Sequence, residues 1–277
     1  MNTFDAVIVG GGPGGATLAN IFASRGIKVA LIERQKDFSK EFRGEALMPS
    51  GKEVLDQIGV DLDAENIKYR KIDQLNIFYK GALIGNPDIE FIKEGQFRWA
   101  SQPQLLEKII EKTSDFKNFK FFRGFKAEDL IYENDRVSGV RIRNMDEDIF
   151  LSGKVVIGFD GRSSMVRRKL DFSIEKFHQP ADVLWFKVPY PKKFIPGSQA
   201  FFSLFPMSML VCIPVYDQKL QVGWVIPSGS YGELKQQGKE KWVEFIRKNS
   251  PKGFSEHLKA CSVSYTHLRA HETINQL

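Results

Sequence analysis

Glycines at positions 10, 12 and 15 form a Gly-x-Gly-x-x-Gly pattern, and an acidic residue, Glu33, follows further along the chain. In a strand–turn–helix unit, Gly10 permits a tight turn, Gly12 lets a pyrophosphate approach the backbone, and Gly15 lets the helix pack closely on the strand. The free N–H groups and positive end of the helix would hold the diphosphate. Glu33 would accept hydrogen bonds from an adenosine ribose and repel a 2′-phosphate. The pattern predicts a site for the ADP half of NAD or FAD, not of NADP.

The elements that must position these residues lie directly around them. Residues 4–9 form a short apolar run of β-branched character, residues 16–25 carry apolar side chains at helical spacing, and a second apolar run at 28–32 ends at Glu33. A glycine-rich turn can also join a strand to a helix without binding anything. Here the strand, the helix and the acidic residue all stand where the mechanism requires them, so we predict a dinucleotide-binding βαβ unit.

The composition is typical of a globular protein and excludes several classes of function. Of the 277 residues, 42% are hydrophobic and 27% are charged, and no apolar run is long enough to span a membrane. The first strand begins almost at Met1, which leaves no room for a signal peptide, so we expect a cytoplasmic protein. Two cysteines, Cys212 and Cys261, and four scattered histidines predict neither a disulfide framework nor a metal site. The net charge of +6 is spread along the chain, which favours attraction of small anions over nucleic-acid binding.

The segment after the first unit is polar and includes Arg34 and Arg43. Arg43 would neutralise diphosphate charge or lie along a flavin edge, and the alternative is a solvated surface residue. A short helix is predicted at 52–58. The alternating pattern at 72–97 then predicts an antiparallel inset with strands at 72–79 and around 89–91. A helix is predicted from Gln102 to Thr113, with a proline in its first turn.

A second strand-to-helix junction lies near the middle of the chain. Short strands, with turns at 133–135 and 144–146, are predicted at residues 119–122, 125–132, 136–143 and 148–151. A separate buried strand at 155–159 ends in Asp160-Gly161, and a helix follows with Ser163 or Ser164 as its cap. Alone, this pattern is typical of a capped turn. In the same sheet as the first unit, it would bring Asp160 to the carboxyl ends of the strands, where open α/β sheets bind ligands.

Helices are absent from the predicted pattern between residues 181 and 227. Antiparallel strands are predicted at 181–189, 198–205, 209–215 and 220–227. Their apolar wall contains Trp185, Phe201, Phe202, Phe205, Met207, Met209 and Trp224. Most of these side chains are core residues and a minority would face a pocket for a flat apolar substrate, but alternation does not distinguish the two groups. The last predicted element is an amphipathic helix at 238–249.

These motifs, in this order, resemble the single-component flavoprotein monooxygenases, the para-hydroxybenzoate hydroxylase-like family that includes ubiquinone-biosynthesis hydroxylases. The matching residues are Gly10-x-Gly12-x-x-Gly15, Glu33, Arg43 and Asp160-Gly161-x-x-Ser164-x-x-Arg167. The resemblance implies an α/β fold in which a Rossmann-type FAD-binding domain is interleaved with an antiparallel β-sheet substrate domain. We expect the FAD-binding domain at residues 1–70 and 98–170 and the substrate domain at 71–97 and 171–262.

The resemblance also implies the chemistry. NADH or NADPH would reduce FAD, dioxygen would add to give a flavin hydroperoxide, and one oxygen atom would pass to an aromatic or other apolar small molecule. The cofactor-binding residues predicted on this basis are Gly10, Gly12, Pro13, Gly14, Gly15, Glu33, Arg34, Arg43, Gln102, Asp160, Gly161 and Ser164. Asp160 would lie near the pyrophosphate and ribityl chain. The sequence identifies no catalytic acid or base.

Two departures from the family concern the end of the chain. The family's third motif, a Gly-Asp pair followed by Ala-Ala-His or similar, does not occur after Asn249, and relatives continue beyond the position of Leu277. Residues 264–273 differ in character from the preceding sequence and resemble a translated adapter fragment. We therefore expect a truncated reading frame in which residues 263–277 are a non-native tail.

The sequence leaves three alternatives to a monooxygenase. Flavin-dependent halogenases carry a Gly-Trp-x-Trp-x-Ile-Pro signature, of which residues 223–227 are a shortened form without the second tryptophan. A geranylgeranyl-type reductase would use the same cofactor. A nucleotide-binding fragment without catalysis is consistent with the missing third motif.

Overall fold

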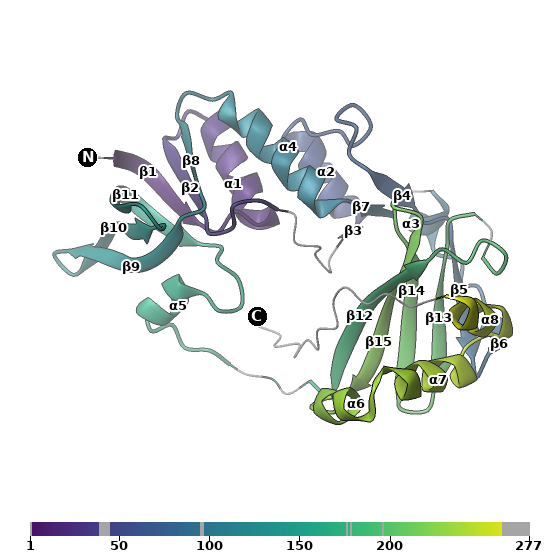
Figure 1. Cartoon of the computed structure of the whole chain (residues 1–277). Coiled ribbons are helices and arrows are strands. Elements are labelled where there is room, and N and C mark those ends of the chain that lie inside the picture. The colour runs from purple at the N-terminus through teal and green to yellow at the C-terminus, as the bar shows by residue number, and fades with distance from the viewer. Residues whose placement is uncertain are drawn as a thin grey trace. The chain divides into compact units, whose positions relative to one another are not determined.

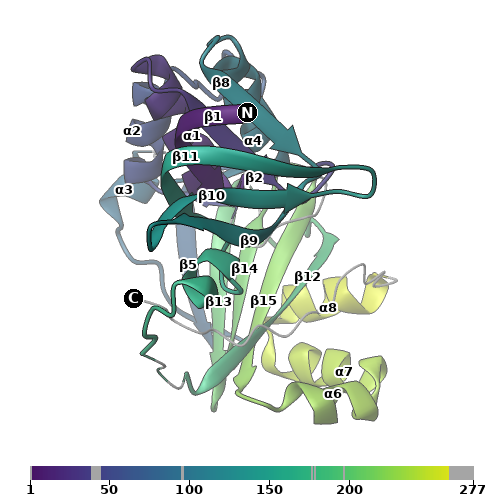
Figure 2. The same ribbon diagram turned by 90° about the vertical axis from the view of Figure 1, so that its left-hand side faces the viewer.

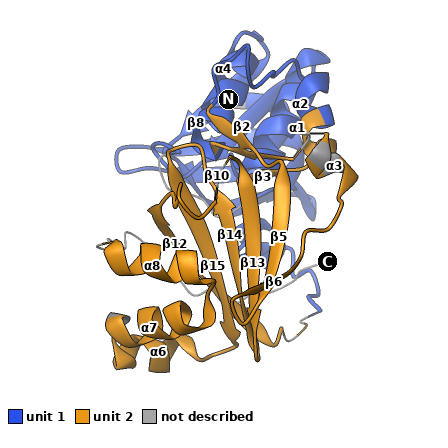
Figure 3. Cartoon of the chain, turned by 90° about the vertical axis from the view of Figure 1, so that its right-hand side faces the viewer, with its two compact units in different colours: residues 1–42, 53–67, 102–175 blue, residues 43–52, 68–101, 176–277 orange. Residues whose placement is uncertain are grey.

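The computed structural model describes residues 2–38, 45–94, 97–175, 177, 179–195 and 197–261. Its contacts divide the chain into two compact units, coloured in Figure 3, and each unit is assembled from separate segments of the sequence. Unit 1 comprises residues 1–42, 53–67 and 102–175, and unit 2 comprises residues 43–52, 68–101 and 176–277. The tail predicted at 263–277 lies outside the described residues. Among the described residues, no helix is both long enough and apolar enough to cross a bilayer.

Unit 1 is built on a mixed sheet of six strands with helices α1 and α4 packed against each other (Figure 1). Helix α2 (Pro49–Gln57) begins in unit 2 and ends in unit 1. The other elements of unit 1 are β1 (Asn2–Val9), α1 (Pro13–Ser24), β2 (Val29–Glu33), α4 (Gln102–Ser114), β8 (Phe119–Arg123), β9 (Lys126–Glu133), β10 (Arg136–Arg143), β11 (Asp148–Gly158) and α5 (Met165–Lys169).

The strand order of this sheet places a switch point beside β1. The order is β8-β2-β1-β11-β10-β9, and Figure 2 shows β1, β11, β10 and β9 side by side. Strand β1 pairs in parallel with β2 on one side and with β11 on the other, β2 pairs in parallel with β8, and β9, β10 and β11 form an antiparallel meander. Because the chain leaves β1 in one direction and returns on its other side, a crevice is expected at the carboxyl ends of these strands.

The parallel strands follow from their sequence. Residues 6–9 of β1 and 29–32 of β2 are at most 4% exposed, as expected for near-continuous apolar runs that are covered on both faces. The two strands predicted at 148–151 and 155–159 are one continuous strand, β11, so the predicted break between them was wrong. Residues 2–9 of β1 pair along this strand, and Gly153 permits the continuity because a Cβ there would lie 2.7 Å from Cγ2 of Val7.

Unit 2 combines a six-stranded sheet with a three-stranded one. Figure 3 shows the order of the larger sheet, β12-β15-β14-β13-β5-β6, and the smaller sheet has the order β3-β7-β4. The elements of unit 2 are β3 (Ala46–Leu47), β4 (Tyr69–Lys71), β5 (Gln74–Tyr79), β6 (Ala82–Gly85), α3 (Glu90–Lys93), β7 (Arg98–Ala100), β12 (Ala181–Pro189), β13 (Gln199–Phe205), β14 (Ser208–Pro214), β15 (Lys219–Pro227), α6 (Tyr231–Gln237), α7 (Lys239–Asn249) and α8 (Lys252–Ala260). The predicted α/β class, with one mixed sheet and a second, largely antiparallel sheet, is confirmed. The exception to antiparallel pairing in this sheet is β13 beside β5.

The two faces of the larger sheet differ in what covers them. Alternate residues of a strand project to opposite faces, and one set packs on the helices. This helix-facing cluster includes Leu184, Phe186, Val188, Phe201, Trp224, Trp242, Ile246, Phe254 and Leu258. On the opposite face, Val183 and Trp185 are half-buried. A second cluster around Ile72, Leu75 and Trp99 includes Ala200 and Ile213 of this sheet.

Several elements of unit 2 differ from the sequence expectation, which did not include strands β3, β4, β6 and β7. The strand predicted around 89–91 was wrong, because residues 90–93 form the short helix α3, in which Ile92 is buried in the second cluster with Ile89 packed beside it. Their spacing of three residues fits one face of a helical turn. Helices α6 and α8 were not predicted. In α8 only Phe254 and Leu258 are buried, which is too few apolar residues to give a clear period.

Candidate functional site

Two glycines after β1 are required by the packing of the backbone itself. Gly10 has a φ of +110°, and a Cβ on it would overlap the carbonyl group of Phe159, the residue after β11. A Cβ on Gly15, in the first turn of α1, would overlap the carbonyl oxygen of Gly10. The strand, the turn and the helix therefore approach too closely for a side chain at either position.

Gly12 differs because nothing in the protein fills the space that its side chain would take. It is the N-cap of α1 with φ −68° and ψ −178°, a conformation open to any residue, and no atom lies within 4 Å of an added Cβ. A side chain there would enter the cavity that Gly12 lines. This arrangement suits a ligand that approaches the backbone at a helix N-terminus. Gly14 has another role, because a Cβ on it would lie only 2.7 Å from the ring of Phe159.

Glu33 ends β2, and backbone N–H groups hold its carboxylate. Gly11 donates to Oε2 at 2.9 Å and Gln35 donates to Oε1 at 2.8 Å. A Cβ on Gly11 would lie 2.8 Å from Cβ of Glu33, so the contact needs a glycine that the motif does not specify. Each carboxylate oxygen accepts more than one hydrogen bond. Glu33 is thus oriented by the turn and can still accept hydrogen bonds from ribose hydroxyl groups.

Asp160 follows β11 and directs its carboxylate toward α5. Oδ1 accepts a hydrogen bond from the Ser164 hydroxyl at 2.5 Å, and Oδ2 accepts from the N–H groups of Met165 at 2.5 Å and Val166 at 3.3 Å. Ser164 is the N-cap, and its Oγ accepts from the N–H of Arg167 at 3.0 Å. The capped turn that the sequence left as an alternative is therefore present. It also shapes the site, because Asp160 and Gly161 line the cavity.

A cavity of about 530 Å³ collects most of the predicted cofactor residues within unit 1. Those that line it are Gly10, Gly12, Pro13, Glu33, Arg34, Gln102, Asp160 and Gly161. Gly14, Gly15 and Ser164 are not among the lining residues and act in the packing and capping contacts of α1 and α5. Arg43 lies outside the described residues. The volume is in the range of small-molecule sites.

The sequence analysis missed part of this wall. Phe125, Lys126 and Ala127 at the start of β9 line the cavity, together with Phe159, Met165 and Arg168. The corner between β8 and β9 reaches the site because the N–H groups of Gly124 and Phe125 both donate to the carbonyl of Glu33, at 2.7 and 3.1 Å. The available signal was Gly124, which has a φ of +80° between two predicted strands. Arg34, Lys126 and Arg168 line the cavity together with the carboxylates of Glu33, Asp37 and Asp160. Lys126 pairs with Glu128 at 3.0 Å, so Arg34 and Arg168 are the cations better suited to a diphosphate.

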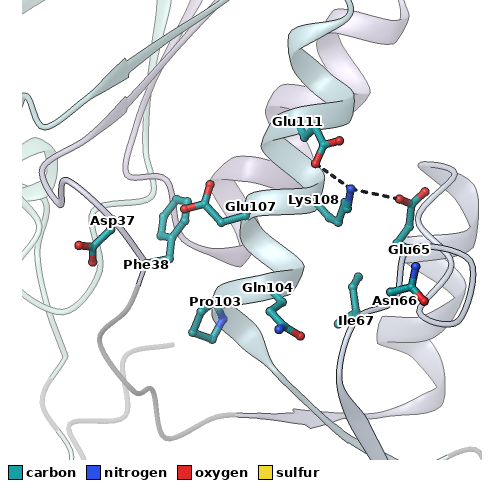
Figure 4. A pocket seen from close by; sticks show the side chains of 10 residues that line it. All are labelled: Asp37, Phe38, Glu65, Asn66, Ile67, Pro103, Gln104, Glu107, Lys108 and Glu111. Carbon is teal, nitrogen blue, oxygen red and sulfur yellow. Dashed lines mark hydrogen bonds and ion pairs between the residues drawn. The ribbon is translucent and has the colours of Figure 1, made fainter.

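A second cavity of about 440 Å³ lies along α4 in unit 1. Figure 4 shows Lys108 between two carboxylates, with its Nζ 2.8 Å from Glu111 and 3.6 Å from Glu65. Arg123 binds both oxygens of Glu107 at 2.8 and 2.6 Å. Since the first cavity includes Gly12 at the N-terminus of α1, where a helix can bind an anion, it is the better candidate for an anionic cofactor.

In unit 2 the structure separates the aromatic side chains of the predicted apolar wall. Phe201, Phe205 and Trp224 belong to the helix-facing cluster. Trp185, Phe202 and Met209 project to the opposite face of the sheet and are half-buried. Met207 is 89% exposed in the turn between β13 and β14. Trp224, from the shortened halogenase-like stretch, donates from Nε1 to the Ser208 hydroxyl at 2.9 Å and stacks on Trp242. That tryptophan is a core residue.

A buried polar cluster joins the two sheets of unit 2. Glu45 is 3% exposed, and its carboxylate accepts hydrogen bonds from Trp99 Nε1 at 3.0 Å and from the Tyr216 hydroxyl at 3.1 Å. The Lys187 ammonium lies 3.9 Å from Glu45. Burial raises the pKa of the Tyr216 phenol to about 12, and the Glu45 carboxylate adds to the increase. The phenol therefore stays protonated at neutral pH and donates to Glu45.

Comparison with known proteins agrees with this geometry. Residues 3–260 match the family described as FAD binding domain. The chain is 30% identical over 257 residues to 6-methylpretetramide 4-monooxygenase of Streptomyces rimosus, covering 89% of this chain and 59% of the relative. It is 30% identical over 193 residues to squalene epoxidase 4 of Arabidopsis thaliana, covering 68% of this chain and 36% of the relative. The chain therefore spans about a third to three fifths of the length of these relatives.

The same fold occurs in solved structures. A crystal structure of PqsL from Pseudomonas aeruginosa superposes with a TM-score of 0.79 at 19% sequence identity, covering 98% of this chain and 73% of the other. At this identity the likeness concerns the fold alone.

Proposed function

Because the chain belongs to the FAD binding domain family over residues 3–260, we propose that it is the cofactor-binding part of an FAD-dependent monooxygenase. Bound FAD would take a hydride from NADH or NADPH, activate dioxygen and supply one oxygen atom to an aromatic or other apolar small molecule. One observation carries the proposal: Gly12 lines the cavity at the start of α1, where a side chain would meet no protein atom and would instead occupy ligand space.

The cavity residues divide between the parts of FAD. The free N–H groups at the positive end of α1 would hold the diphosphate next to Gly12, with Arg34 and Arg168 as its cationic neighbours, whereas Pro13 has no N–H to donate. Glu33, held by the turn, would accept the hydroxyl groups of the adenosine ribose. Each role follows from the group's charge and from its place in the cavity wall.

Asp160 has a structural role in addition to its predicted place near the cofactor. Both of its oxygens already accept hydrogen bonds from Ser164 and from the first N–H groups of α5. We infer that these contacts make it a positioning residue, which fixes the Asp160-Gly161 turn that lines the cavity.

The substrate would lie on the face of the large unit 2 sheet that α7 and α8 do not cover. Trp185, Phe202 and Met209 give this face an apolar, half-buried surface. We assign no catalytic acid or base, since oxygen transfer is chemistry of the cofactor and the side chains orient the substrate and exclude water. The similarity to the Streptomyces rimosus enzyme favours an aromatic substrate, and the similarity to squalene epoxidase 4 makes an isoprenoid chain the second candidate.

A halogenase is not favoured. The tryptophan of the shortened Gly-Trp-x-Ile-Pro stretch, Trp224, is 3% exposed, stacked on Trp242 and bonded to Ser208 in the helix-facing core. Its side chain is therefore part of the packed core.

The test is turnover by the purified chain loaded with FAD. We expect flavin absorbance that co-elutes with the protein, and oxidation of NADH or NADPH that accelerates with a phenolic fused-ring compound such as 1-naphthol. Mass spectrometry should then find a product heavier by one oxygen atom. Reductant oxidation without any oxygenated product from 1-naphthol or from farnesol would support a reductase instead, and absence of bound flavin would refute the proposal.

A further inference from the structure

Trp185 is a large aromatic side chain on the less covered face of the unit 2 sheet. It alternates along β12 with Leu184 and Phe186, which belong to the helix-facing cluster. Leu184 and Phe186 are 1% and 6% exposed, whereas Trp185 is only half-buried. Part of its indole surface is therefore available on the face where the proposed substrate would lie.

The indole ring of Trp185 packs on one residue of the neighbouring strand, Gly223, which we call its seat. Trp185 stands directly opposite Gly223 in the antiparallel pair of β12 and β15. A Cβ on Gly223 would lie 2.7 Å from Cη2, 2.7 Å from Cζ3 and 3.0 Å from Cε3 of Trp185. These three consecutive atoms belong to the six-membered ring, and all are closer than van der Waals contact allows. The ring thus lies across the backbone of Gly223, in the space that a side chain would fill.

The backbone of Gly223 does not itself require glycine. Its φ is not in the positive region, unlike that of Gly229 at +80° in the turn that follows β15. The position sits inside a regular strand, paired with Trp185 on one side and Val211 on the other. Glycine destabilises the interior of a strand. Here it leaves the space that the indole ring of Trp185 occupies.

The ring lies at the border of an apolar and a polar part of this face, because Lys187 and Gln221, which pair with each other two residues along, project to the same side. Val211, Val225, Phe202 and Met209 project to the same face by strand alternation, and all are half-buried. A tryptophan laid flat on such a surface offers a broad π-face to a planar ring, which gains stacking energy beyond its buried area. A flexible hydrocarbon chain gains only the burial.

We propose that Trp185, seated on Gly223, is the stacking surface for the substrate and selects planar fused-ring molecules over flexible isoprenoid chains. The inference rests on the proposed function for the statement that the bound ring is a substrate. The seat itself is a property of unit 2.

The test measures binding of two probes to the full chain by isothermal titration calorimetry, with 1,8-dihydroxyanthraquinone as the planar probe and farnesol as the flexible one. We expect Trp185→Ala to weaken binding of the planar probe about tenfold, within the range found when an aromatic stacking partner is removed. The affinity of Trp185→Phe for the planar probe should lie between that of the unaltered chain and that of Trp185→Ala. Farnesol should bind equally to the unaltered chain and to Trp185→Ala.

A double-mutant cycle tests the seat. Gly223→Ala should weaken binding of the planar probe by displacing the indole ring, and it should add nothing in the Trp185→Ala background. Trp224→Phe, on the helix-facing side of the same sheet, is the matched control and should stay within twofold of the unaltered chain. Thermal melts followed by circular dichroism establish that each variant is folded at the titration temperature.

Several outcomes would overturn the inference. These are no binding of 1,8-dihydroxyanthraquinone to the unaltered chain, equal binding by Trp185→Ala, or an equal effect of Gly223→Ala with and without Trp185. FAD titration of the same proteins separates this inference from the proposed function. Planar-probe binding that depends on Trp185 in a chain without FAD affinity refutes only the function, and FAD binding without a Trp185 effect refutes only the stacking surface.

Discussion

At the scale of single residues, the glycines after β1 serve different purposes that the spacing of the motif does not reveal. Gly10 and Gly15 are fixed by backbone contacts within the protein, and Gly11 makes room for Glu33. Gly12 alone borders open space in the cavity. The motif predicted Gly12 and Glu33 from their established mechanics. The role of Gly11 could not be predicted, because it depends on which way the Glu33 side chain turns.

Tyr216 supplies a prediction about pH. Its folded-state pKa of about 12 lies above the ordinary value of 10 because the phenol is buried. The folded state therefore holds this proton more tightly than the unfolded chain, so the contribution to stability is complete below pH 10 and is lost as pH rises toward 12. We expect the free energy of unfolding of the wild type to exceed that of Tyr216→Phe at pH 8, with the difference shrinking between pH 10 and 12.

Urea denaturation of both proteins across that range, with tyrosinate absorbance as a second signal, measures the difference. A gap that stays constant from pH 8 to pH 12 would show that Tyr216 is not buried as described. At pH 8 the gap should be about 1 kcal/mol, the usual net value of one hydrogen bond.

At the scale of elements, the sequence predicted those that have a clear period or a clear turn. The first βαβ unit has two apolar runs separated by an amphipathic helix, and the β9–β10 turn contains Asn134 and Asp135, both with positive φ. What could not be predicted depends on partners distant in sequence. Strand β11 continues through Gly153 because it pairs with β1 on both sides of this residue, and α3 forms with Ile92 in a buried cluster.

Helix α8 gives the corresponding prediction for stability. Phe254 is fully buried in the helix-facing cluster, with its ring centroid 5.1 Å from that of Phe201. Phe254→Ala should lower the free energy of unfolding by about 3–5 kcal/mol, because it removes a large side chain and leaves a cavity. The matched control is Phe245→Ala on α7, which is 44% exposed and should cost roughly 1 kcal/mol. Denaturant melts of the two variants compare them, and equal losses would contradict the packing described for α8.

At the scale of the whole molecule, the proposed cofactor cavity and the proposed stacking surface lie in different units that the sequence interleaves. The described lining of the cofactor cavity comes from unit 1, and Trp185 with its seat belongs to unit 2. The sequence predicts a cofactor domain and a substrate domain in several segments each. Residues 43–52 and 98–101 belong to unit 2 through contacts that no local sequence pattern encodes. FAD affinity and planar-ring affinity should therefore respond to different substitutions.

The most direct test of the account is an FAD titration of the unaltered chain against Gly12→Val, followed by flavin fluorescence. No protein atom lies within 4 Å of a Cβ at this position, so the variant should keep the melting temperature of the unaltered chain while its affinity for FAD falls at least tenfold. If Gly12→Val binds FAD as tightly as the unaltered chain, the cofactor does not lie at the start of α1 and the proposed site is wrong.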